Sequence, residues 1–148
     1  MNYRRLSVVI LLWFAGCSGS GNPPVNPAVI IQGKIFNGGQ PIPVPRADVG
    51  FGLVEVTLFP EGSSSGSVET ATAKADGSFE ILGLGKGVPP GNYKLAVSQR
   101  DQEPGSAAAT ALDAFSKENT PIKIQVPDTK VGGRFNLEVI DLSTYAKK

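Results

Sequence analysis

The stretch from Thr70 to Ile81 has the most clearly specified local structure in the chain, because it alternates small or apolar residues with polar ones around an Asp-Gly pair. Asp76-Gly77 is typical of a tight two-residue turn, since such a pair tolerates the positive φ angles that the turn requires. We therefore expect a β-hairpin here. The chain also has 18 Gly and 12 Pro and only 18% charged residues, which favours short strands joined by turns over long surface helices.

Seven stretches have the alternation of a half-buried strand. They lie at residues 29–36, 54–59, 68–73, 79–81, 93–98, 122–126 and 135–139. Within them we expect Phe135, Leu137 and Val139 to share one face, and we expect Gly83 to form a bulge that turns Leu84 inward. Ser106 to Asn119 changes to a helical period and predicts one short crossover helix before Pro121. The prediction is an all-β, seven-stranded antiparallel Greek-key sandwich with one helix.

The first 16 residues have the pattern of a cleaved signal peptide. Arg4 and Arg5 precede an apolar run from Leu6 to Phe14, and the small residues Ala15-Gly16 follow it. The apolar run is about half the roughly 20 residues that span a bilayer, so a permanent transmembrane helix is the weaker interpretation.

Cys17 is the chain's one cysteine, and it follows the leader directly. The segment Phe14-Ala15-Gly16-Cys17 resembles the lipobox of bacterial lipoproteins, although Phe14 stands where Leu is usual. The resemblance implies a lipid (palmitate among the acyl chains) on Cys17, and Ser18 after it implies the outer membrane, facing the periplasm or the exterior. Stable anchoring takes more than one acyl chain, which such lipoproteins carry on this single residue.

The Gly/Ser-rich and then Pro-rich segment that follows Cys17 has neither periodicity nor apolar mass, so residues 17–28 are predicted to be the lipidated cysteine and a tether. The folded domain is then 29–142, with a tail at 143–148. Inside the domain, Gln40 to Leu53 contains three alternate prolines, which cannot donate to a sheet ladder, and it predicts a loop or an edge.

The loop from Gln40 to Leu53 is the candidate partner site, since binding residues concentrate on loops. Its candidate contact residues are Ile42, Val44, Arg46 and Phe51. The alternative, that the loop only covers a sheet edge, stays open.

Catalytic and cofactor chemistry finds little support. The chain has no His, so the commonest general base and metal ligand is absent. Several serines and carboxylates are candidate nucleophiles, acid/base pairs or metal ligands, but solvated surface positions are the simpler interpretation for all of them. These are Ser63, Ser64, Ser65, Asp101, Glu103, Glu138 and Asp141. We expect no enzyme, no cofactor and no metal.

Phosphate binding, an internal Lys–Asn cross-link and nucleic-acid binding are also disfavoured. Gly83-x-Gly85-x-Gly87 opens onto prolines instead of a helix and cannot present a helix N-terminus to a phosphate. A Lys34–Asn136 cross-link would need both groups buried, whereas the alternation places both opposite to the apolar face. The net charge of +1 without a basic cluster also argues against nucleic acid.

Four motifs occur in order along the domain. They are Ile31-x-Gly33-x-Ile35, Val54-x-Val56-x-Leu58, Ala75-Asp76-Gly77-x-Phe79-x-Ile81 and Pro90-Gly91-x-Tyr93-x-Leu95-x-Val97. Together they resemble a carboxypeptidase regulatory-like domain, the transthyretin-like or prealbumin-like sandwich of small bacterial lipoproteins. The resemblance implies a non-catalytic binding or scaffolding module at the cell envelope, with an envelope protein or glycan as partner. The alternatives are a purely structural envelope component and a hydrolase without a recognisable motif.

Overall fold

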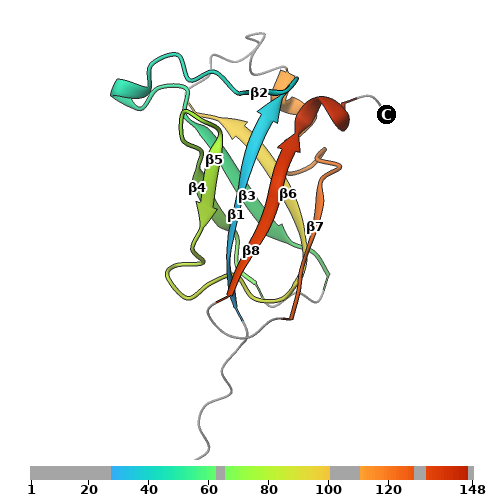
Figure 1. Ribbon diagram of the computed structural model, residues 1–148. Helices are drawn as coiled ribbons and strands as arrows, with labels where there is room; N and C mark the ends of the chain where they lie inside the picture. Colours follow the sequence, from blue (N-terminus) through green and yellow to red (C-terminus); the bar gives the residue numbers. More distant parts are fainter. Residues whose placement is uncertain (1–27, 63–65, 101–110, 129–132, 147–148) are drawn as a thin grey trace, which may run out of the picture.

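The computed structural model describes residues 28–62, 66–100, 111–128 and 133–146, and these form two β-sheets that face each other (Figure 1). The all-β prediction is confirmed for this part of the chain. Residues 1–27, which are the predicted leader and all but the last residue of the predicted tether (17–28), lie outside the described residues, so signal cleavage and lipidation stay predictions.

Eight strands lie within the described ranges, where seven were expected. They are β1 (Val29–Asn37), β2 (Gln40–Pro41), β3 (Val54–Pro60), β4 (Glu69–Thr72), β5 (Ser78–Ile81), β6 (Gly91–Gln99), β7 (Lys123–Val126) and β8 (Gly133–Asp141). The additional strand, β2, is two residues long, and it pairs with the end of β1 across the Gly38-Gly39 turn. Two short 3-10 helices, η1 (Ala47–Val49) and η2 (Leu142–Thr144), complete the list.

The first sheet is built around β1, which pairs with β2, β5 and β8, and the second has the order β4-β3-β6-β7. All pairs in the second sheet are antiparallel. The expectation of a wholly antiparallel sandwich is wrong for the first sheet, because β1 and β8 are parallel over Val29 to Phe36. A period of two shows that a strand has two faces but carries no information about the direction of its neighbour.

The Asp76-Gly77 turn forms as predicted, but the hairpin does not. The Gly77 N–H donates to the Lys74 carbonyl at 2.9 Å, and the Lys74 N–H donates to the Ser78 carbonyl at 2.8 Å. However, β4 pairs with β3 in the second sheet, whereas β5 pairs with β1 in the first. The turn is therefore a corner that carries the chain from one sheet to the other.

A β-bulge interrupts β8 opposite Gly33. The register passes from Gln32↔Asn136 to Lys34↔Val139, which leaves two residues of β8 opposite one of β1. Glu138 takes a positive φ of 56° there. The bulge reverses the faces of the strand, so Val139 is 54% exposed and Ile140 is buried. The prediction that Val139 shares the face of Phe135 and Leu137 is therefore wrong.

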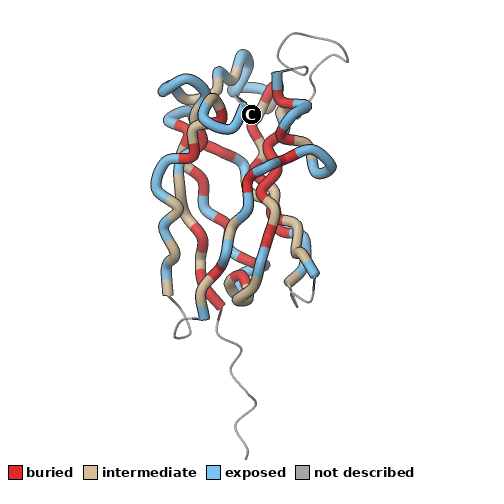
Figure 2. The backbone as a smooth tube through the Cα atoms, turned by 90° about the vertical axis from the view of Figure 1, so that its right-hand side faces the viewer, coloured by how far each residue is buried: buried red, intermediate tan, exposed pale blue. Residues whose placement is uncertain are grey.

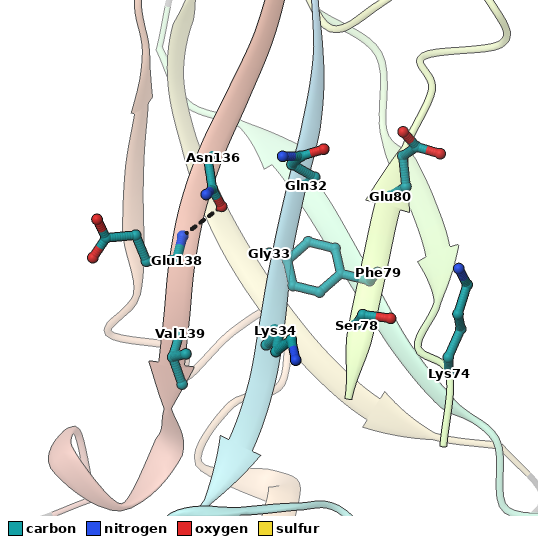
Figure 3. A pocket seen from close by; sticks show the side chains of 10 residues that line it. All are labelled: Gln32, Gly33, Lys34, Lys74, Ser78, Phe79, Glu80, Asn136, Glu138 and Val139. Carbon is teal, nitrogen blue, oxygen red and sulfur yellow. Dashed lines mark hydrogen bonds between the residues drawn. The ribbon is translucent and has the colours of Figure 1, made fainter. Parts of the chain in front are cut away.

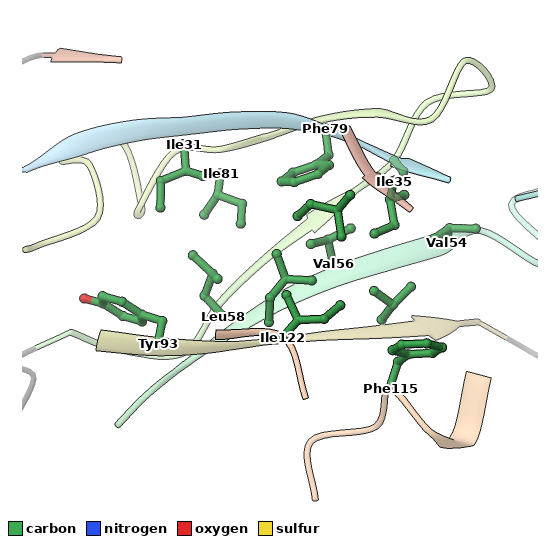
Figure 4. Close-up of a cluster of buried hydrophobic side chains, with 14 of the residues drawn as sticks. Ile31, Ile35, Val54, Val56, Leu58, Phe79, Ile81, Tyr93, Phe115 and Ile122 are labelled. Carbon is green, nitrogen blue, oxygen red and sulfur yellow. The ribbon is translucent and has the colours of Figure 1, made fainter. Parts of the chain in front are cut away.

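The two sheets enclose one continuous apolar core (Figure 4). Side chains of the first sheet, such as Ile31 and Ile81, face Leu58 and Tyr93 of the second, and all four are fully buried. The Tyr93 hydroxyl donates to the Pro89 carbonyl at 2.9 Å, which satisfies the one polar atom of that side chain. Figure 2 shows buried positions along the strands, and the connections at the upper end of the sandwich are largely exposed.

Two local expectations are wrong. Leu84 does not turn inward: it is 87% exposed and lies in a turn with φ of 53°. The predicted helix over Ser106–Asn119 is helical only at residues 111–113 among its described residues, and turns follow as far as Asn119. Its residues 106–110 lie outside the described part. Leu112 and Phe115 nevertheless pack into the core, as their spacing indicated.

Candidate functional site

The candidate partner loop, residues 40–53, has a stem that packs on the core. Ile42 and Val44 are half-buried against the core cluster. The Gln99 side-chain amide donates to the Pro43 carbonyl at 2.8 Å and to the Gly52 carbonyl at 2.6 Å. Because one amide group joins both arms of the loop, the stem is tied to the last residue of β6.

The tip of this loop closes on itself. Its η1 turn begins after Arg46, and the Phe51 N–H donates to the Arg46 carbonyl at 3.0 Å. Gly52 has a φ of 72°, and a Cβ there would lie 2.7 Å from Pro45 Cδ, so the tip needs a glycine at this position. The closed tip exposes Val49 by 59% and Phe51 by 38%.

An apolar hollow of about 340 Å³ lies between the stem and the segment that follows residue 110. Ile42, Pro43, Pro45, Gln99 and Leu112 line it. Its walls are mostly apolar, and Gln99 is already occupied by its two carbonyl partners. The hollow thus lies where the stem meets the core, and it opens to solvent beside the loop.

The structure divides the four predicted contact residues into two pairs. Ile42 and Val44 belong to the stem, where they cover the core, while Arg46 and Phe51 lie at the exposed tip. The stem thus packs on the core as a covering segment would, while the partner site stays a prediction, now limited to the exposed tip. Val49 is a tip residue that the sequence analysis did not select, and nothing in its spacing separates it from Val44.

A second, polar hollow of about 420 Å³ lies on the outer face of the first sheet (Figure 3). Its lining residues come from β1, β5, β8 and the turn before β5: Gln32, Gly33, Lys34, Lys74, Ser78, Phe79, Glu80, Asn136, Glu138 and Val139. The floor of the hollow is tightly packed at Gly33, where a Cβ would lie only 3.1 Å from the Phe79 ring and 3.3 Å from the Glu138 carbonyl oxygen in the bulge.

Two of the charged side chains that line this hollow, Lys34 and Glu80, have ionic partners in the protein. Arg134 donates to Glu80 and, at 3.0 Å, to Gln32. Lys34 Nζ lies 3.8 Å from Asp76 Oδ2. The Ser78 hydroxyl and backbone N–H, which both donate to Asp76, hold the pKa of that carboxyl below its usual value, and Lys34 adds to the effect.

Lys34 and Asn136 both line the polar hollow, but neither has the burial that a cross-link needs. The Lys34 side chain is 47% exposed, and the Asn136 side chain accepts the Glu138 N–H at 2.9 Å. Figure 3 shows both side chains on the outer face, as their alternation indicated.

The other candidate positions do not converge. Ser63 to Ser65, Asp101 and Glu103 lie outside the described residues. Asp141 accepts hydrogen bonds from Gly38, Gly39 and Ser143, and Glu138 forms the bulge. Within the described ranges there is no group of three His, Cys, Asp or Glu residues that could hold a metal ion. No helix among those residues is both long and apolar enough to cross a membrane.

Comparisons with known proteins give no family. No protein-family model and no curated protein matches the chain. A DUF3823 family protein from Parabacteroides merdae has a TM-score of 0.39 and 18% identity, over 76% of this chain and 45% of its own. A 9R-lipoxygenase from Cyanothece has a TM-score of 0.38 and 14% identity, over 82% of this chain and 17% of its own. The chain thus spans less than half the length of either protein, and both similarities are too weak to indicate a shared function.

Proposed function

We propose that this chain is an exported lipoprotein, anchored through lipid on Cys17, whose β-sandwich is a non-catalytic module that binds an envelope protein or glycan. The observation that carries the binding role is the closed tip of the loop 40–53, which exposes Val49 and Phe51 on a backbone fixed by Gln99. A loop that is already ordered loses less conformational entropy when a partner binds. Arg46 and Asp48 flank the two apolar side chains and supply polar contacts at the rim.

We also propose the finer assignment of the sandwich, a transthyretin-like, carboxypeptidase regulatory-like domain with Greek-key connections. Its support is that the four motifs fall on β1, β3, β5 and β6, which contribute inner-face residues of both sheets. The anchor, and with it the outer membrane facing the periplasm or exterior, rests on the sequence from Arg4 to Ser18.

The binding role is tested by affinity recovery from solubilised membranes with the full chain. The Val49→Ser/Phe51→Ser variant should lose at least about tenfold of any recovered partner, because it removes the apolar anchors of the tip. Its matched control is Val139→Ser/Tyr145→Ser, which changes side chains of nearly equal exposure, 54% and 38%, at other places. Equal recovery by the tip variant, the control and the wild type would reject the loop as the binding site.

The anchor is tested separately by membrane fractionation. Cys17→Ser should move the protein from the membrane fraction to the soluble fraction, because it removes the atom that carries the lipid. If the variant stays in the membrane fraction and keeps residues 1–16, the leader itself is the anchor and the lipoprotein proposal is wrong.

A further inference from the structure

The loop between β5 and β6, residues 82–90, displays a leucine at its apex. Leu84 is 87% exposed, and its φ of 53° is in the left-handed region that non-glycine residues rarely adopt. Two hydrogen bonds to the Leu82 carbonyl, from Gly85 at 3.0 Å and from Gly87 at 2.9 Å, close the turn beneath it. A large apolar side chain is thus held in water on an unfavourable backbone, a combination that adds nothing to folding.

This loop lies at the end of the sandwich where the domain begins. The Val29 N–H donates to the Val88 carbonyl at 3.0 Å, and the Val88 N–H donates back to Val29 at 2.7 Å. A Cβ on Gly87 would lie 2.9 Å from the carbonyl carbon of Ala28. Leu84 is therefore displayed beside the first described residue, while the η1 loop lies at the opposite end of the molecule (Figure 1).

Leu84 shares its hollow with one exposed cation, Lys86, and with the carboxylate of Glu69, which is buried and accepts the Ser67 hydroxyl, and other exposed apolar side chains lie on the adjoining segments. Leu82 is 49% exposed, and Val68 is 56% exposed next to residues that share a hollow of about 430 Å³ with Leu84. Lys86 is exposed and is the only charged residue of the loop 82–90. Apolar side chains next to a cation suit the boundary between acyl chains and anionic headgroups.

The tether limits how far this end can move from the anchor. Residues 18–28 reach at most roughly 40 Å when fully extended, at about 3.6 Å per residue. We propose that the end surface formed by Leu84, Leu82, Val68 and Lys86 contacts the bilayer that holds the lipid on Cys17, with Leu84 inserted among the acyl chains. This inference rests on the proposed lipid anchor. It also fixes an orientation, in which the loop 40–53 points away from the membrane.

The test uses a single fluorescent side chain in the full chain, reconstituted in vesicles of phosphatidylcholine and phosphatidylglycerol with or without brominated acyl chains. Leu84→Trp is compared with Phe51→Trp at the other end of the sandwich. The chain's own Trp13 lies in the predicted leader, so cleavage should remove it, and the wild type measures any fluorescence that remains from uncleaved protein. Brominated lipid should quench Trp at position 84 at least about threefold more than at position 51, because only the former would lie below the headgroups.

Each other outcome is informative. Membrane-anchored protein with equal quenching at both positions overturns this inference and leaves the proposed anchor intact. Protein that is absent from the membrane fraction overturns both. Fluorescence at position 84 that neither brominated lipid nor soluble acrylamide quenches would mean that a second copy of this chain covers the surface, and this would overturn the inference.

A second variant separates contact from folding. Leu84→Gly removes the side chain and relieves the positive φ, so the melting temperature should stay the same or rise. A clear fall in melting temperature would show that Leu84 supports the fold, and this would overturn the inference.

Discussion

A single residue, Asp141, joins several segments at the end of the first sheet where β1 and β8 finish. The carboxylate of Asp141, the last residue of β8, accepts the N–H groups of Gly38 at 2.9 Å and Gly39 at 2.6 Å. It also accepts the Ser143 hydroxyl at 2.8 Å and the Ser143 N–H at 3.0 Å. One side chain thereby joins the β1–β2 turn to the junction of β8 and η2, and Gly38 of that turn lies 103 residues from Asp141 in sequence.

These hydrogen bonds predict a pH dependence. The Ser143 hydroxyl is the largest cause that holds the pKa of Asp141 below its usual value of 3.8, and the backbone N–H groups of Ser143, Gly39 and Gly38 add to it. A lowered pKa stabilises the fold above the usual value, and this contribution is lost as the pH falls through the lowered one. Asp141→Asn should therefore melt below the wild type at neutral pH, and the difference should shrink as the pH falls.

The measurement is the melting temperature as a function of pH, with Ser143→Ala as the intermediate variant. Removing the hydroxyl should move the pKa of Asp141 upward toward its usual value, which carboxyl NMR titration reports directly. A constant difference between wild type and Asp141→Asn across acidic pH would show that the carboxylate does not stabilise the turn.

At the scale of elements, the loop 40–53 has two parts, a stem that packs on the core and an exposed tip, which is the proposed binding part. Its stem covers the core next to β2, which limits edge exposure of the first sheet. Its tip extends away from the core. Gly50 at φ 73° and Gly52 at φ 72° provide the positive backbone angles with which the chain turns back toward β3. Removing the whole loop would therefore lower stability as well as remove the proposed binding tip, so it could not test the two parts separately.

Single substitutions should separate the two parts. Ile42→Ser and Val44→Ser should each lower the free energy of unfolding by about 1–2 kcal/mol, because each exposes part of an apolar side chain that packs on the core. Val49→Ser and Phe51→Ser should each change it by less than about 0.5 kcal/mol. Urea denaturation measures both sets, and equal losses in stem and tip would contradict this division.

At the scale of the whole molecule, the two sheets share one core. Most of its buried residues come from β1 and β5 of the first sheet and from β3 and β6 of the second, β7 and β8 add Val126 and Ile140, and the connections add others such as Leu112, Phe115 and Ile122. The corner at Asp76-Gly77 links the sheets covalently as well. Neither sheet has a separate core of its own in the described residues, so each depends on the other for burial.

We therefore expect a single unfolding transition. In urea, far-UV circular dichroism, which follows the strands, should give the same midpoint as the fluorescence of Tyr93, which is fully buried between the sheets. Two separated midpoints would show that one sheet persists without the other. The Tyr145→Phe variant, altered at an exposed position, removes the second tyrosine of the domain as a control.

The sequence alone determined the positions of all the strands but β2 in the described residues, because alternation and Gly-rich turns are local properties of the chain. The alternation also identifies which residues of β1, β3, β5 and β6 face the core, and it places Lys34 and Asn136 on the outer face. It also identified the loop 40–53 as irregular, since alternate prolines cannot join a ladder.

Only the tertiary structure decided which strands are neighbours. A period of two is the same for a hairpin and for a corner, so the residues around Asp76-Gly77 could not show that β4 and β5 enter different sheets. The bulge was expected at Gly83 but lies at Glu138, where the Phe79 ring fills the place of a side chain on Gly33. Likewise, the exposure of Leu84, Val49 and Phe51 depends on how distant segments close around them, and a local pattern does not contain that information.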